Sequence, residues 1–141
     1  MSLQATDSPG LLLWRATLRW QRLIAAALKP LDLTHVQFVL LASTWWLTHV
    51  AGETPSQRRL ADHAGTDAMM TSQVLRVLEA KGLVARTAHP DDSRARSISV
   101  TSRGAALAEQ AVTVVEAADA DFFRPAGNDR ALLDVLRRLA G

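Results

Sequence analysis

The stretch TPSQRRLADHAGTDAMMTSQVLRVLEAKG, residues 54–82, carries the signals for two short helices separated by a tight turn. Thr54 as N-cap, Pro55 at the first helical position and Gln57 as capping-box partner predict where the first helix begins. Gly65 is typical of the residue that ends such a helix. Two consecutive helices, the first one short, with a connection of a few residues that begins at a glycine, indicate a helix-turn-helix.

The second helix of this pair is predicted between Asp67, which can cap its N-terminus, and Gly82, which can end it. Its apolar spacing indicates one face turned toward a core. The residues expected on that inner face are Thr71, Val74, Leu75 and Leu78.

A β-hairpin is expected directly after the two helices. LVART, residues 83–87, is typical of a strand, and SISVT, residues 97–101, alternates polar and apolar residues. This alternation predicts that Ile98 and Val100 point inward and that Ser97 and Ser99 point outward. A helix-turn-helix followed by a hairpin is a winged helix-turn-helix, so the intervening segment would form the tip of the wing.

The flanking segments are predicted to be helical. Leucine, alanine and tryptophan recur at three- and four-residue steps over residues 11–28, and Pro30 stops this pattern. Thr34 and Gln37 form a capping box for a helix that runs toward Val50. After the hairpin, Thr101 can cap a long Ala/Val-rich helix, and Asn128 can cap a last, Leu-rich one.

These elements predict a mainly α fold with a small β-hairpin wing in one domain, residues 1–141. Residues 54–103 would form the winged helix-turn-helix lobe, and residues 11–50 and 104–140 the helices that flank it. The chain has no cysteine, which excludes disulfides, thiolate nucleophiles and thiol-based oxidation sensing. Without a signal segment or a long apolar run, a cytoplasmic location and no membrane partner are expected.

The expected lobe concentrates positive charge. The whole chain carries a net charge of +2, whereas residues 56–104 hold eight Lys or Arg against five Asp or Glu, a local balance of +3. Because the N-terminal part of a recognition helix contacts base edges in the major groove, its polar residues are candidate DNA contacts. The candidates on this helix are Met69, Thr71, Ser72, Gln73 and Arg76. The alternative is a solvated helix face, with methionine as core filler.

Four blocks of the sequence, in the same order, resemble the MarR family (multiple antibiotic resistance regulators). They are LTHVQF (residues 33–38), PSQRRLADHAG (55–65), LEAKGLV (78–84) and DDSRARSISVTSRG (91–104). The resemblance covers nearly the whole chain and implies a dimeric, sequence-specific DNA-binding transcriptional regulator, expected to act as a repressor. It further implies that residues 54–103 bind DNA and that residues 11–50 and 104–140 are mainly dimerisation and effector-cleft helices. The expected operator is palindromic, with half-sites about 34 Å apart.

The resemblance also implies roles for the wing. Arg94 or Arg96 would approach the minor groove, and Asp92 would brace an arginine of the wing. Ser93 stands where the family commonly has a second arginine, and Arg96 is the candidate to replace it. Of the two arginines, Arg96 is the one expected to reach DNA, and Arg94 the one expected to shape the tip.

An effector site is a further expectation from the resemblance. Trp14, Trp20, Trp45 and Trp46 fall on two helices that line a ligand cleft in this family, and His35 could supply a polar contact. Such a cleft would suit a small aromatic or phenolic molecule. The alternative is that these tryptophans fill the core or the dimer interface.

Other functional classes have less support in the sequence. No Gly-rich phosphate loop or nucleophile–base pattern suggests an enzyme, and no cofactor is expected. His35 and His49 would lie about 21 Å apart on one helix, at ~1.5 Å per residue, so no metal site is expected from them. A winged helix that binds only protein or RNA stays open, because a fold does not dictate its ligand.

Overall fold

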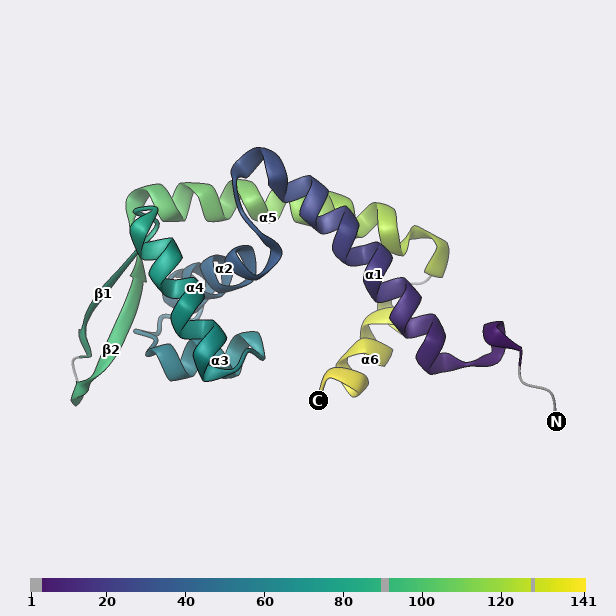
Figure 1. Ribbon diagram of the computed structural model, residues 1–141, viewed down its shortest axis with the longest axis horizontal. Coiled ribbons are helices and arrows are strands. Elements are labelled where there is room, and N and C mark those ends of the chain that lie inside the picture. The colour runs from purple at the N-terminus through teal and green to yellow at the C-terminus, as the bar shows by residue number, and fades with distance from the viewer. Residues whose placement is uncertain (1–3, 90–91, 128) are drawn as a thin grey trace.

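A computed structural model describes residues 4–89, 92–127 and 129–141, without the side chains of residues 5, 89 and 92–95. The chain is mostly helical with one two-stranded hairpin (Figure 1). The α-helices and strands, in order, are α1 (Pro9–Leu28), α2 (His35–His49), α3 (Gln57–Ala64), α4 (Ala68–Ala80), β1 (Val84–His89), β2 (Asp92–Val100), α5 (Ser102–Phe123) and α6 (Asp129–Ala140). Short 3-10 turns span Ala5–Asp7, Lys29–Leu31 and Arg124–Ala126.

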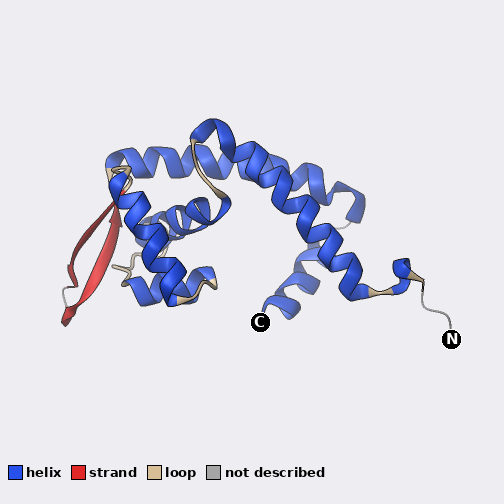
Figure 2. Cartoon of the chain, viewed as in Figure 1, coloured by secondary structure: helices blue, strands red, loops and turns tan. Residues whose placement is uncertain are grey.

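The elements separate into two regions along the long helix α5. The short helices α3 and α4 and the hairpin lie at one end, and α1, α6 and both termini lie toward the other (Figure 1). The only strands in the described part of the chain form the antiparallel hairpin that projects from one end of the molecule (Figure 2). The mainly helical fold with a wing, expected from the sequence, is confirmed.

The core lies where α2 and α5 meet the lobe. α5 packs against α1 and α2, and α2 also contacts α3 and α4. Fully buried side chains from these elements include Ile24, Leu28, Leu40, Leu41, Leu47, Leu60, Leu75, Leu78, Ile98, Ala108 and Ala111. No single helix in the described ranges is long and apolar enough to span a membrane, although the bent pair Pro9–Leu31 and His35–His49 passes that test when taken together.

Most predicted helix starts are confirmed by hydrogen bonds. Thr34 and Gln37 form both bonds of a capping box, and Asp67 and Thr101 accept backbone N–H bonds as N-caps of α4 and α5. The first helix begins two residues earlier than predicted, at Pro9, because Ser8 caps it. The predicted cap Asn128 lies outside the described residues.

The predicted start of α3 is wrong. Ser56, not Thr54, is the N-cap, and its hydroxyl accepts the N–H of Arg59 at 3.1 Å. Pro55 precedes the helix, where its carbonyl accepts the N–H of Ile98 at 2.9 Å. The segment before α3 is therefore extended because it pairs with the wing, a partner about forty residues away.

The same pairing corrects the orientation of Ser97. Predicted to point outward, Ser97 is buried and bridges to Ser56. Its hydroxyl lies 2.8 Å from that of Thr87 across the hairpin, which gives the buried oxygen a hydrogen-bond partner. Ile98 points inward as predicted.

Candidate nucleic-acid interface

α4 has one buried and one exposed face. Its buried side chains are those of Thr71, Leu75 and Leu78. Met69, Gln73 and Arg76 are exposed, with Met69 at 72%, and Ser72 is half-buried. The steps of four and three residues place Met69, Gln73 and Arg76 on a single helix face, which is the arrangement that contact with one groove requires.

Thr71 departs from the expected set of DNA contacts. It is fully buried, and its hydroxyl donates to the carbonyl of Asp67 at 2.8 Å and lies 2.7 Å from that of Thr66. Since that hydroxyl holds the first turn of α4 to the turn before it, Thr71 supports the helix rather than offering a side chain to a groove. Its place in the predicted inner stripe is confirmed, and its expected DNA contact is wrong.

The wing stands beside α4 with Arg96 exposed. β1 and β2 pair antiparallel, and Arg96 lies opposite Ala88 in the register. Arg96 also lines a concave surface of about 700 Å³ between the wing, α3 and the start of α4. Its lining residues are Ser56, Gln57, Arg58, Ala61, Asp62, Thr66, Ala68 and Arg96. The side chains of Arg94 and Asp92 lie outside the described part, so their expected roles stay predictions.

Several cations of the lobe are engaged within the protein. The guanidinium of Arg59 forms two bonds with Glu53, at 2.9 and 3.1 Å, which lower the pKa of that carboxyl and raise the pKa of the arginine. Arg86, Lys81 and Arg103 donate to groups on neighbouring elements. The sequence indicates only the positive charge of Lys81, Arg86 and Arg103, because their partners are set by tertiary packing.

Among the side chains of the lobe that the structure describes, three arginines remain directed to solvent. Arg58, Arg76 and Arg96 are exposed, and their side chains have no hydrogen-bond or ion-pair partner among the described residues. They come from α3, α4 and β2. The charge available to a nucleic acid is therefore distributed over three elements.

The candidate effector residues form separate contacts. Trp20 donates from Nε1 to Oδ1 of Asp119 at 2.7 Å, and its ring meets that of His35 edge-on, with centroids 4.9 Å apart. Burial lowers the pKa of His35, and the charge of Asp119 opposes this shift. These three residues join α1, α2 and α5.

The other three tryptophans lie elsewhere. Trp46 stacks on His63 of α3 with centroids 5.4 Å apart, Trp45 lies beside His49, and Trp14 is 61% exposed on α1. Within the described residues of one chain the five candidates therefore do not line one cavity, and the expected Trp-lined cleft stays a prediction. Trp45 and Trp46 lie about ten residues after His35 on α2, which places them roughly 15 Å from it along the helix axis at 1.5 Å per residue.

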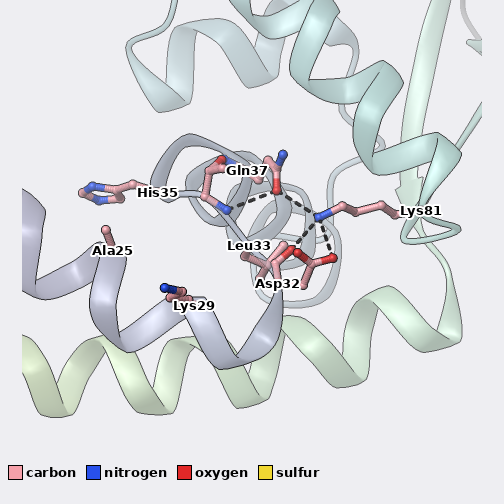
Figure 3. Close-up of a pocket in the computed structure, with 8 residues that line it drawn as sticks. Ala25, Lys29, Asp32, Leu33, His35, Gln37 and Lys81 are labelled. Atoms are coloured by element: carbon pink, nitrogen blue, oxygen red, sulfur yellow. Dashed lines mark hydrogen bonds and ion pairs between the residues drawn. The ribbon is translucent and has the colours of Figure 1, made fainter.

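A cavity of about 410 Å³ lies between the end of α1, the start of α2 and the end of α4 (Figure 3). It is lined by Ala25, Lys29, Asp32, Leu33, Thr34, His35, Gln37 and Lys81. Of the five candidate effector residues only His35 lines it. Both lysines of the chain, Lys29 and Lys81, do so, and neither was predicted from the sequence.

Large apolar side chains are exposed at the far end of the molecule. On α1 these are Leu12, Leu13, Trp14 and Leu23, and on α6 they are Leu133, Val135, Leu136 and Leu139. α6 has no buried residue. An amphipathic helix without a fully buried residue among the described ones leaves an apolar face for another protein surface.

Comparison with known proteins identifies the family. The sequence profile of the MarR family matches residues 33–95. The uncharacterized HTH-type transcriptional regulator YdcH of Bacillus subtilis is 44% identical over 133 residues, which are 94% of this chain and 89% of that protein. The chain belongs to the MarR family. An HTH-type transcriptional repressor of Mycobacterium tuberculosis is 40% identical over 119 residues, 82% of this chain and 81% of the repressor.

Solved structures of MarR-family members share the fold. The repressor CouR bound to a 23-mer DNA duplex superposes with a TM-score of 0.83 at 27% identity, covering 100% of both chains. CouR from Rhodococcus jostii RHA1 bound to p-coumaroyl-CoA gives a TM-score of 0.80 at 25% identity, covering 98% of this chain and 93% of that chain. The expected family, winged fold and function as a DNA-binding transcriptional regulator are confirmed.

Proposed function

We propose that this MarR-family protein binds a palindromic operator as a homodimer. α4 enters the major groove with Gln73 and Arg76 at base edges or phosphates, Ser72 beside them and Met69 at a thymine methyl group. Arg96 of the wing contacts the backbone or minor groove next to it, and Arg94 shapes the wing tip. The observation that carries the proposal is the single exposed face of α4 beside Arg96 and the concave surface between α3 and the wing.

The second copy in this proposal covers the exposed apolar residues of α1 and α6. A two-fold axis there would present two copies of α4 to one face of DNA, with half-sites about one turn, ~34 Å, apart. The expected assignment of residues 54–103 to DNA binding and of 11–50 and 104–140 to dimerisation fits this arrangement. The proposed role is binding and release of chromosomal DNA in the cytoplasm, with no chemical step.

Repression is the proposed consequence of binding. The mycobacterial relative is named a transcriptional repressor, and CouR, named a transcriptional repressor, was solved on a DNA duplex. A protein that occupies an operator of about two turns blocks access to the promoter that contains it. This supports repression for the present chain.

Selection of binding sites from genomic DNA with the purified protein tests the proposal. We expect a palindrome, and a fall in affinity of about one log unit per log unit of salt for each phosphate neutralised. Gln73→Ala should lose preference for one base pair, and Arg58→Ala should weaken binding evenly and reduce the salt slope by about one. Binding only to RNA, or to no nucleic acid, would favour the alternative of an RNA-binding or protein-binding winged helix.

We also infer that a small aromatic or phenolic acid releases the operator. The observation that favours it is the cavity beside His35, which both lysines line. CouR, solved with p-coumaroyl-CoA, supports ligand binding for the family. Titration of the protein–DNA complex with hydroxybenzoic and cinnamic acids should release DNA and change the fluorescence of Trp20, which touches His35. The absence of both effects across the acids would contradict this inference.

A further inference from the structure

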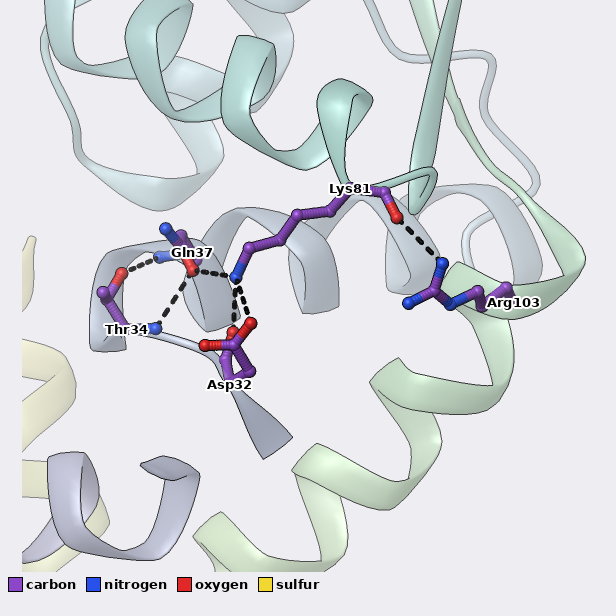
Figure 4. A network of polar contacts seen from close by, with 5 residues as sticks. All are labelled: Asp32, Thr34, Gln37, Lys81 and Arg103. Carbon is purple, nitrogen blue, oxygen red and sulfur yellow. Dashed lines mark hydrogen bonds and ion pairs between the residues drawn. The ribbon is translucent and has the colours of Figure 1, made fainter. Parts of the chain in front are cut away.

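Lys81 joins the end of the recognition helix α4 to a distant turn. It follows α4 directly, and its ammonium group donates to the backbone carbonyl of Asp32 and to Oε1 of Gln37 at 3.2 Å (Figure 4). The carboxylate of Asp32 lies 3.5 Å from the same nitrogen. Lys81 is separated from these partners by more than forty residues, so the contacts close a long loop of the chain.

The acceptors that meet Lys81 are held in place by the turn between α1 and α2. Asp32 has a left-handed backbone with φ of 55°, and its N–H donates to the carbonyl of Lys29 at 3.0 Å. Oε1 of Gln37 accepts the N–H of Thr34 at 3.1 Å as part of the capping box of α2. Two of the three oxygens that Lys81 meets, the carbonyl of Asp32 and Oε1 of Gln37, are therefore held by other bonds, while the carboxylate of Asp32 belongs to a side chain that is 98% exposed.

The backbone of the same residue is tied to α5. Nη1 of Arg103, in the first turn of α5, donates to the carbonyl of Lys81 at 3.1 Å (Figure 4). One residue further, the carbonyl of Gly82 accepts the hydroxyl of Thr101 at 2.7 Å. The end of α4 is thus bonded to the turn that follows α1 and to the start of α5.

This position gives Lys81 control over where the base-reading end of α4 lies. α1, α5 and α6 form the region through which the proposed dimer assembles, while Met69 lies in the first turn of α4 and Gln73 and Arg76 lie along its middle. The thirteen residues of α4 span about 20 Å, so a rotation of about 10° at Lys81 would displace its first turn by roughly 3.5 Å. That displacement is about the 3.4 Å rise of one base pair.

We propose that Lys81 is a positioning residue that sets the half-site spacing accepted by the dimer. The proposal rests on the proposed operator binding and adds a determinant of specificity that does not touch DNA. Lys81 acts by fixing α4 to the dimer helices, so two half-sites are recognised together only at one separation. Without its contacts, each lobe can still bind a half-site but takes up a range of positions.

Two measurements test this role, with Lys29→Met as a matched control. Lys29 is the only other lysine and lines the same cavity, but its side chain has no hydrogen bond or ion pair among the described residues. First, affinity is measured for operators whose half-sites are moved apart or together by one base pair. Second, a spin label on Val77→Cys, which is a unique thiol in this cysteine-free chain, reports the distance between the two copies of α4.

For the native protein and Lys29→Met we expect a preference of about tenfold or more for one spacing, and a narrow distance distribution. Lys81→Met should lower that preference to about threefold or less and broaden the distribution, while its affinity for an isolated half-site stays within about twofold. Lys81→Arg, which keeps a cationic donor, should restore much of the preference. Circular dichroism checks folding, and Lys81→Gln replaces Lys81→Met if the latter unfolds.

A folded Lys81 variant with the native spacing profile and the native distance distribution would overturn the proposal. Equal effects of Lys29→Met and Lys81→Met would also overturn it, since a general loss of charge would then explain both. If the native protein binds no palindrome at any spacing, the proposed operator binding itself fails. Measuring palindrome binding by the native protein therefore distinguishes failure of the operator-binding proposal from failure of the Lys81 proposal.

Discussion

Arg86 on β1 donates a hydrogen bond to the backbone carbonyl of Ser72 on α4, with 3.3 Å between Nη2 and the oxygen. Its Nη1 donates to Oε1 of Gln57 on α3 at 3.1 Å. Nε lies 3.8 Å from Oε2 of Glu79, which is an ion pair without a hydrogen bond. One side chain of the wing thereby fixes both helices of the helix-turn-helix.

Arg86→Met should lower both stability and DNA affinity. Two hydrogen bonds from a guanidinium that is only 20% exposed are lost, which predicts a decrease of about 2 kcal/mol in the free energy of unfolding. DNA affinity falls because α4 and the wing are no longer held in one arrangement. Urea unfolding and duplex titration measure the two effects. Arg58→Ala, at an exposed arginine, should change stability by less than about 0.5 kcal/mol; equal stability of both variants would contradict the role of Arg86.

Met69→Ala should remove the recognition of one thymine methyl group. The Met69 side chain is 72% exposed, and contact between its apolar atoms and water is unfavourable. In the groove the same atoms would gain apolar contact with a thymine methyl group. Replacing the contacted thymine by uracil deletes only the methyl group and should weaken native binding by about 0.8 kcal/mol, or about fourfold. The same replacement should leave the affinity of Met69→Ala unchanged. A scan in which no uracil position distinguishes the two proteins would exclude this contact.

Stability should fall as the pH decreases through the range in which His35 titrates. Burial lowers the pKa of His35 below its ordinary value of 6.5, so the unfolded chain binds protons more readily than the folded one. The free energy of unfolding is then highest above 6.5 and decreases as the pH falls below it. His35→Gln should have a smaller slope between about pH 8 and pH 5. Parallel curves for the two proteins would show that His35 does not contribute.

Gly104→Ala should be strongly destabilising. A Cβ atom at this position of α5 would lie 1.9 Å from the carbonyl oxygen of Leu83, a backbone atom that cannot rotate away. Moving α5 from the α4–β1 connection should cost about 2 kcal/mol or more, measured as a lower midpoint of thermal unfolding. Gly10→Ala on α1 meets nothing within 4 Å and should be neutral or stabilising by up to about 1 kcal/mol. Similar midpoints for the two variants would contradict the close contact at Gly104.

Local signals in the sequence were sufficient for most helix starts. The caps at Thr34, Asp67 and Thr101 depend on a side chain and an N–H three residues apart, so the structure repeats what the sequence predicts. The predicted start of α3 was wrong because a long-range contact overrode the local capping signal. Its Thr54 cap was a valid local choice, but pairing of Pro55 with Ile98 made Ser56 the cap instead.

The candidate DNA-binding face was predictable in part. The period of α4 separated Gln73 and Arg76 from the buried stripe, whereas Thr71 was assigned to both faces and proved to be buried. The charge excess of the lobe did not indicate which of its cationic side chains are free to contact DNA. Arg86 and Arg103 could not be excluded from sequence because their partners lie on other elements, while the partner of Arg59 is Glu53 in the loop before α3.

By itself the sequence determined the order of the elements, the winged helix-turn-helix, the family and the polar face of α4, since these follow from periodicity, capping and motifs within a few residues. Only the tertiary structure decided which cations face solvent, that the tryptophans form separate contacts, and that Lys81 joins α4 to the turn after α1. Such contacts close loops of tens of residues, and their geometry depends on how whole helices pack rather than on local spacing.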